Sequence, residues 1–194
     1  MTCIKKIKID NTIYEASTDY RTAIQCNAIS NDKTIGDLER ALGILYMVFG
    51  ESGLENTQHY QKLLNWVLNW LSLGKEINNN DDEIDMDYIE DMEYIEASFM
   101  SDYGIDLENN NDMEWSKFYK LMNGLSNSEF GNCCVLNRIR NLRNFDINTI
   151  SDNKERQKMA KIKEQIALKK NKKENHLTKE QEESMAKLNE ILGW

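Results

Sequence analysis

The sequence predicts a mainly α-helical protein, in which a compact multi-helix domain carries a small N-terminal β-hairpin and a charged C-terminal helical extension. Three observations support this fold class. The chain of 194 residues contains no proline, the residue that most strongly interrupts helices. Apolar residues recur at helical spacing along most of the chain. They make up 40% of the sequence, which at this length is enough to form a core.

The N-terminal segment predicts the β-hairpin. Apolar residues alternate irregularly over residues 4–14, and Asp10 and Asn11 lie in the middle of this stretch. Both residues tolerate the left-handed conformations of tight turns, so a small hairpin should form here. A short helix should follow it, capped by Ser17 or Thr18.

Two apolar helices are expected next. The first begins near Thr34 and ends at Gly50, and the second begins at Thr57 and ends at Gly74. Aliphatic residues at helical spacing already supply a buried stripe for the second helix. Its two large aromatic residues are therefore the better candidates for exposure: Trp66 and Trp70.

Three further helices complete the predicted domain. The pattern indicates a helix over residues 88–100, a turn at Gly104 and an aromatic helix over residues 112–123. Ser126 and Glu129 have the spacing of a capping box, which predicts another helix that runs to about Arg143.

The C-terminal region is expected to be helical and highly charged. A long helix should run from about Asp152 to Lys170, and a last helix should begin near Thr178. Because a helix this polar rarely folds alone, it should dock by a thin apolar stripe or self-associate. We therefore predict a core domain over residues 1–150 and a charged helical extension over residues 151–194.

Charge is distributed unevenly along the chain, whose formal net charge is −9. Residues 76–114 contain fifteen acidic and no basic residues, whereas residues 154–173 contain nine basic and two acidic residues. The asymmetry suggests an acidic face and a basic tail, which could pair head to tail, recruit a partner or simply be solvated. The net charge disfavours direct binding of nucleic acid by the chain as a whole.

No motif indicates catalysis, a cofactor or a metal site. The four cysteines form no C-x-x-C pair, and His59 and His176 have no evident partner in the sequence. A glycine-rich phosphate loop is missing from the sequence as well. Neither a signal peptide nor a membrane-spanning apolar run is present. We therefore expect a soluble intracellular protein that is not an enzyme, with no cofactor and no membrane partner.

Two sets of residues are candidates for binding a protein partner. Aromatic and methionine side chains could line a groove for an apolar helix, although they could equally form the core. These candidates are Trp66, Trp70, Met92, Trp115 and Tyr119. An alternative is an acidic face that mimics nucleic acid, formed by Asp85, Asp87, Glu90, Asp91, Glu93 and Glu96.

Several landmarks in order resemble a phage protein family over about residues 7–170. They are DNTIYEASTDYRTAIQ, LLNWVLNWLSLGKE, DYIEDMEYIEASFMSDYGIDL, MEWSKFYKLMNGLSNSEFG and IRNLRNFDINTISDNKERQKMAKIKEQIAL. The family is the tail assembly chaperone-like proteins of long-tailed phages of Gram-positive hosts. This chain departs from its pattern at Trp115-Ser116, where many members have two tryptophans, at the glycine-free turn of Asp10 and Asn11, and beyond residue 172.

The resemblance implies a role in tail morphogenesis, because genes of this family lie between those for the tail tube and the tape measure protein. It implies a non-enzymatic chaperone that binds the tape measure protein. The tail tube protein and a second copy of this chain are further candidate partners. Such a protein would act in the cytoplasm of the infected or lysogenic bacterial host. The alternative is an acidic phage inhibitor that mimics nucleic acid against a host defence nuclease.

Overall fold

The computed structural model of the chain describes four stretches, residues 3–75, 85–109, 112–127 and 133–169. Contacts divide the chain into two units, which comprise residues 1–82 with 86–141 and residues 83–85 with 142–194. Within the described stretches, seven α-helices and one two-stranded antiparallel sheet confirm the predicted fold class. The predicted domain boundary near residue 150 stays a prediction, and the expected helix after Thr178 lies outside the described residues.

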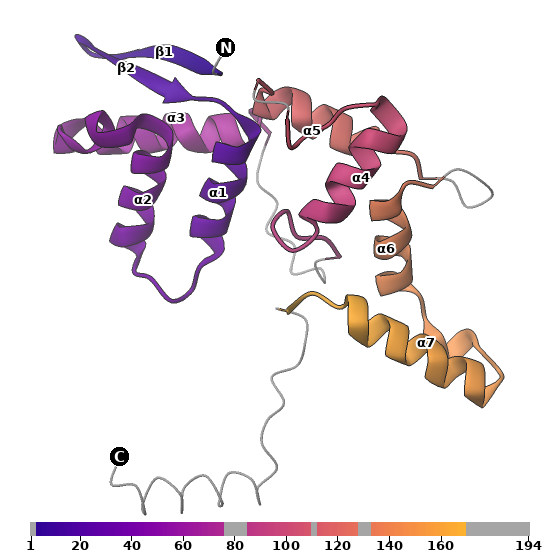
Figure 1. Cartoon of the computed structure of the whole chain (residues 1–194). Helices are drawn as coiled ribbons and strands as arrows, with labels where there is room; N and C mark the ends of the chain where they lie inside the picture. The colour runs from indigo at the N-terminus through magenta and orange to yellow at the C-terminus, as the bar shows by residue number, and fades with distance from the viewer. Residues whose placement is uncertain (1–2, 76–84, 110–111, 128–132, 170–194) are drawn as a thin grey trace, which may run out of the picture. The chain divides into compact units, whose positions relative to one another are not determined.

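The N-terminal hairpin of the first unit consists of β1 (Ile4–Ile9) and β2 (Thr12–Ser17), which pair in antiparallel register (Figure 1). Asp10 and the residue after it form the tight turn, which confirms the prediction. Asp10 adopts a left-handed conformation with a φ of 52°, which aspartate tolerates better than most residues. Ile7 and Tyr14 lie opposite each other in the hairpin, and both are buried.

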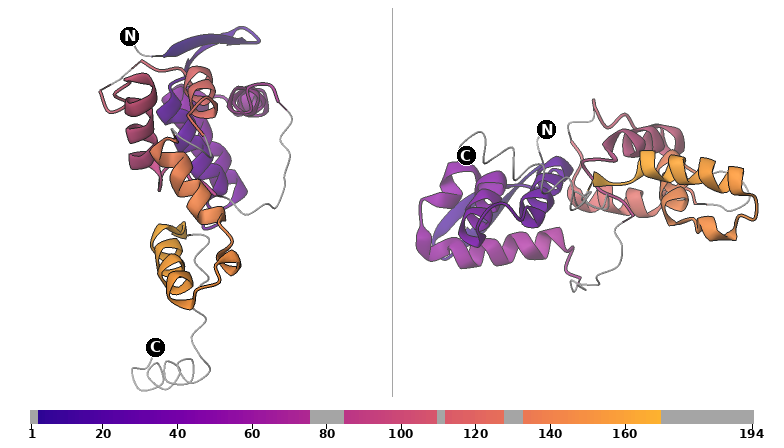
Figure 2. Two further views of the ribbon diagram at one scale, coloured as in Figure 1. Left: turned by 90° about the vertical axis from the view of Figure 1, so that its right-hand side faces the viewer. Right: turned by 90° about the horizontal axis from the view of Figure 1, so that it is seen from below.

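Three helices follow: α1 (Tyr20–Asn31), α2 (Asp37–Phe49) and α3 (Tyr60–Leu71). Two short 3-10 turns, η1 (Gly50–Leu54) and η2 (Thr57–His59), connect α2 to α3. Figure 2 (left) shows α3 along its axis while α1 and α2 are seen from the side, so α3 crosses them. Because β2, α1 and α3 all contact α2, this helix joins the hairpin to the other two helices.

The first helix begins at a different cap from the expected one. Asp19, and not Ser17 or Thr18, caps α1, since its carboxylate accepts the N–H of Arg21 at 2.9 Å. Thr18 precedes the cap position, and its buried hydroxyl donates to the side chain of Glu114. Helix α2 begins at Asp37 with Gly36 as its N-cap residue, three residues after the predicted start near Thr34. The predicted start at Thr57 falls on the first residue of η2, and α3 itself begins at Tyr60.

Helix α4 (Met92–Tyr103) begins one turn later than the predicted helix over residues 88–100. The Asp87 carboxylate accepts hydrogen bonds from the backbone N–H groups of Ile89 and Glu90, at 2.9 and 3.1 Å. An aspartate side chain that binds the backbone in this way stabilises a turn in competition with a helix. The helix therefore starts only after this turn is complete.

The predicted turn at Gly104 is confirmed. Gly104 has a φ of 64°, in the left-handed region that favours glycine. Its N–H donates to the Met100 carbonyl, and the N–H of Ile105 donates to the Phe99 carbonyl. These bonds satisfy carbonyl groups at the end of α4 and redirect the chain.

Helix α5 (Trp115–Asn123) starts three residues after the predicted first residue, Asp112. The backbone of Glu114 instead forms an antiparallel bridge with Asp19, flanked by two hydrogen bonds of 3.0 Å. This strand-like contact with a segment distant in sequence requires extended backbone, so the helix cannot begin earlier.

Helix α6 (Val135–Asn144) begins well after the capping box predicted at Ser126. The N–H of Ser126 donates to the Asp102 carboxylate at 2.8 Å, and its carbonyl accepts the N–H of Cys134. Ser126 therefore stabilises a loop, and the sulfur of Cys134 accepts a backbone N–H in the first turn of α6. Glu129, the other half of the predicted box, lies outside the described residues.

An aromatic cluster forms the centre of the first unit, and it comprises Tyr20, Phe99, Trp115 and Phe118. All four residues are at most 2% exposed, and they come from α1, α4 and α5. Phe118 lies in the middle, with its ring stacked on Tyr20, Phe99 and Trp115 at centroid distances of 4.5, 5.2 and 5.9 Å. This stacking holds three helices of distant sequence together.

A second buried contact fastens the hairpin turn to η2 and α3. The Tyr14 hydroxyl lies 2.7 Å from His59 Nδ1, and His59 Nε2 lies 3.3 Å from the Asp10 carboxylate. The neutral histidine tautomer with its proton on Nε2 satisfies both contacts, because Tyr14 then donates to Nδ1 and Nε2 donates to Asp10. Hydrogen bonds from Lys62 lower the pKa of Asp10, so this carboxylate is charged at neutral pH.

Replacing His59 by alanine should destabilise the protein by about 2 kcal/mol, because it leaves the buried Tyr14 hydroxyl without its partner. In a Tyr14→Phe background the same change should cost less, since no hydroxyl remains to be satisfied. Urea denaturation of the four proteins of this cycle measures the difference. An equal cost in both backgrounds would contradict the importance of the Tyr14–His59 hydrogen bond.

In the second unit, α7 (Asn153–Ile166) follows a short 3-10 turn, η3 (Ile147–Thr149). Asp152 caps α7, since its carboxylate accepts the first backbone N–H groups of the helix at 2.8 Å. The predicted start of the charged helix is therefore confirmed. Lys163 donates to the carbonyl of Phe145 at 2.6 Å, so the connector that precedes the helix lies against it.

Candidate functional site

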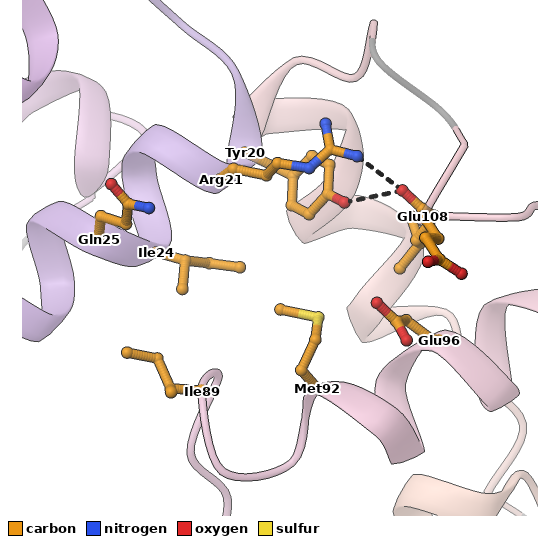
Figure 3. A pocket seen from close by; sticks show the side chains of 9 residues that line it. Tyr20, Arg21, Ile24, Gln25, Ile89, Met92, Glu96 and Glu108 are labelled. Carbon is orange, nitrogen blue, oxygen red and sulfur yellow. Dashed lines mark hydrogen bonds between the residues drawn. The ribbon is translucent and has the colours of Figure 1, made fainter.

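The most promising site in the first unit is an open pocket between α1 and the segment that contains α4, which we call the α1–α4 groove (Figure 3). It has a volume of about 430 Å³, within the range of small-ligand and side-chain pockets. Nine residues line it: Tyr20, Arg21, Ile24, Gln25, Ile89, Met92, Glu96, Leu107 and Glu108.

Hydrogen bonds to one carbonyl hold the two walls of the groove together. The Tyr20 hydroxyl and the Arg21 guanidinium both donate to the Leu107 carbonyl, at 3.2 and 2.7 Å (Figure 3). Arg21 also lies 3.8 Å from the Asp19 carboxylate. The guanidinium of Arg21 therefore helps to hold the walls of the groove in place.

The interior of the groove is apolar. Figure 3 shows Ile24 of α1 and Ile89 and Met92 of the opposite wall directed into the pocket. Ile89 is 56% exposed although it is a large aliphatic residue. An exposed aliphatic side chain at the mouth of an apolar pocket is typical of a surface that binds a protein partner.

The edge of the groove is acidic. Glu96 lies one helical turn after Met92 on α4, and Glu108 lies beyond the end of that helix. Glu93 is exposed on the same helix. The guanidinium of Arg21 is hydrogen-bonded to the Leu107 carbonyl. The carboxylates of the groove therefore favour a partner that carries positive charge.

The structure places only one of the five predicted partner-binding residues in the groove, namely Met92. Trp115 is 2% exposed within the aromatic cluster, and Tyr119 packs against it with a ring distance of 5.7 Å. Trp66 and Trp70 stack on each other at 6.1 Å and are half-buried. The five residues therefore form no single surface, and their roles in binding stay predictions.

Three apolar residues of the groove were missed by sequence reasoning: Ile24, Ile89 and Leu107. Ile24 belongs to a short helix of weak pattern, and Ile89 lies in the turn before α4. One signal for the groove is present in the sequence, because Ile89 lies between the acidic residues Asp87 and Glu90. A fully solvated face would carry a polar residue at this position.

The predicted acidic face is less continuous than the sequence suggests. Asp91 is only 1% exposed, and its carboxylate accepts the N–H of Asp87 at 3.0 Å. Asp87 binds the backbone of the same turn, as described above, and Asp85 accepts a hydrogen bond from Asn144. Aspartates that stabilise local structure contribute less to a face for a basic partner, whereas Glu90 and Glu93 are exposed.

Other chemistry has little support within the described stretches. No group of three or more histidine, cysteine, aspartate or glutamate side chains there is arranged to hold a metal ion. All four cysteines are free, and burial raises the pKa of Cys26 to about 12, so this thiol is protonated at neutral pH. No described helix combines the length and apolar character needed to cross a membrane.

Comparison with known proteins identifies a family. The family model described as Bacteriophage Gp15 protein matches residues 2–168 of the chain. No curated protein and no solved structure matches the chain.

Proposed function

The chain belongs to the Bacteriophage Gp15 protein family, and we therefore propose that it is a non-enzymatic tail assembly chaperone that binds the tape measure protein of its phage. The proposal joins the sequence resemblance described above with one structural observation, the α1–α4 groove. A groove with an apolar interior and an acidic edge suits a helix that presents an apolar side chain flanked by basic residues.

The physical need for such a protein follows from the length and apolar character of a tape measure protein. Before the tail tube assembles around it, a long amphipathic helix exposes apolar surface and is prone to aggregate. A small acidic protein bound along that helix covers apolar residues, and its net charge of −9 keeps the complex dispersed. Binding needs no chemical step, so tail tube subunits can displace the chaperone as they polymerise.

Ile89 is the residue on which we place the greatest weight. It is exposed in the free protein, so a partner that covers it gains apolar burial of about 2 kcal/mol. Met92 lies beside it and has a flexible side chain that adapts to different partners. Glu96 and Glu108 would then select the orientation of the bound helix through basic residues of the partner.

Co-expression with the tape measure protein tests the proposal. We expect the tape measure protein to become soluble and to remain bound at about 500 mM NaCl, where screening leaves the apolar contacts largely intact. The matched control is co-expression with an unrelated amphipathic helical protein of similar length. Failure to solubilise or bind the tape measure protein would contradict the proposal.

The alternative function is that of an acidic inhibitor that mimics nucleic acid, and the exposed carboxylates of Glu90 and Glu93 favour it. Such an inhibitor would bind a basic nuclease surface and lose affinity steeply as salt increases. Binding to a host nuclease that disappears at high salt, together with no effect on the tape measure protein, would support this alternative over the chaperone.

A further inference from the structure

We propose that the α1–α4 groove binds α7 of a second copy of this chain, so that the free protein self-associates. The two surfaces have complementary charge and each exposes an isoleucine. This self-association belongs to the protein without its partner, and it does not require that the tape measure protein use the same groove.

Helix α7 presents an exposed basic stripe. Arg156 donates to the Ile150 carbonyl and Lys163 donates to the Phe145 carbonyl, so these two cations stabilise the second unit itself. The remaining three basic residues of the helix are exposed and spaced by one helical turn: Lys154, Lys158 and Lys161. One helical turn after Lys158, beside Lys161, lies Ile162, which is 40% exposed.

The groove provides the complementary features. Its apolar interior of about 430 Å³ has room for an aliphatic side chain such as that of Ile162. Two glutamates, Glu96 and Glu108, line the groove, and Glu93 is exposed on the same helix as Glu96. An isoleucine flanked by lysines therefore matches an apolar pocket flanked by glutamates.

Arg21 is the one lining residue whose charge opposes this contact, among the nine that form the pocket. Its guanidinium donates to the Leu107 carbonyl at 2.7 Å and lies 3.8 Å from the Asp19 carboxylate. These interactions hold the positive charge against the groove wall, and the Asp19 carboxylate offsets it. The net character of the groove edge thus remains acidic.

Reciprocal charge reversal in the full chain tests the proposal by sedimentation velocity over a range of protein concentrations. The α7 variant carries Lys158→Glu and Lys161→Glu, and the groove variant carries Glu96→Lys and Glu108→Lys. The unmodified protein should associate as its concentration rises, and association should weaken about tenfold between low and high salt. Each variant alone should stay monomeric, because its α7 and its groove then carry charges of the same sign.

Mixing the two variants should restore association, since the acidic α7 of one variant now meets the basic groove of the other. Two matched controls make the same changes of net charge at exposed sites elsewhere. The first carries Lys5→Glu and Lys8→Glu on β1. The second carries Glu51→Lys in η1 and Glu55→Lys directly after it. These controls should associate like the unmodified protein. A monomeric unmodified protein at all concentrations, or no association in the mixture, would overturn the proposal.

Discussion

Replacing Phe118 by alanine should lower the free energy of unfolding of the first unit by about 4 kcal/mol, a typical cost for removing a fully buried aromatic ring. Phe118 is 0% exposed, and its ring stacks on residues from α1, α4 and α5. The alanine leaves a cavity at the point where these helices meet. Because the stacked rings come from segments far apart in sequence, the surrounding structure cannot close around it without moving a helix.

Urea denaturation followed by tryptophan fluorescence measures this effect, since Trp115 lies 5.9 Å from the Phe118 ring and reports on the same cluster. The matched control is Met100→Ala on α4, where the side chain is 50% exposed and little burial is lost. This control should change stability by less than about 0.5 kcal/mol. A similar, small effect of both substitutions would contradict the central role of the aromatic cluster.

Local signals in the sequence predict several features of the fold correctly. The hairpin turn at Asp10 and the end of α4 at Gly104 both depend on left-handed backbone, which only a few residue types tolerate. The start of α7 at Asp152 follows from the ability of an aspartate side chain to accept backbone N–H groups. Such features can be predicted because their cause lies within a few residues of the sequence.

Predictions fail where a distant segment decides the local structure. Asp112 has the residue type of a helix cap, but the bridge between Glu114 and Asp19 keeps the backbone extended. Ser126 has a capping pattern, but the Asp102 carboxylate binds its N–H in a loop. Neither partner can be identified from the sequence near the predicted helix start.

The candidate site shows the same limit. The sequence predicts Met92 as a partner-binding residue because methionine side chains adapt to apolar partners, and Met92 does line the groove. Ile24 lies in the opposite wall, nearly seventy positions earlier, and nothing in the sequence pairs the two segments. Burial of Asp91 could not be predicted either, since an acidic block is usually solvated on all sides.

Replacing Ile89 by aspartate should weaken binding of the tape measure protein by about thirtyfold, if the α1–α4 groove receives an apolar side chain. The substitution removes apolar contact area worth about 2 kcal/mol, which corresponds to this change in affinity. It also places a carboxylate where the bound apolar side chain would leave it poorly hydrated. Because Ile89 is 56% exposed in the free protein, the fold itself should tolerate the change.

Met100→Asp is the matched control, because Met100 is 50% exposed, belongs to the same unit and does not line the groove. Binding can be measured by titrating a labelled tape measure fragment with each variant, after circular dichroism has shown equal helix content. The control should bind like the unmodified protein. Equal loss of affinity in both variants would indicate a general effect of added charge, and unchanged affinity in Ile89→Asp would place the partner on another surface, such as the stacked pair of Trp66 and Trp70.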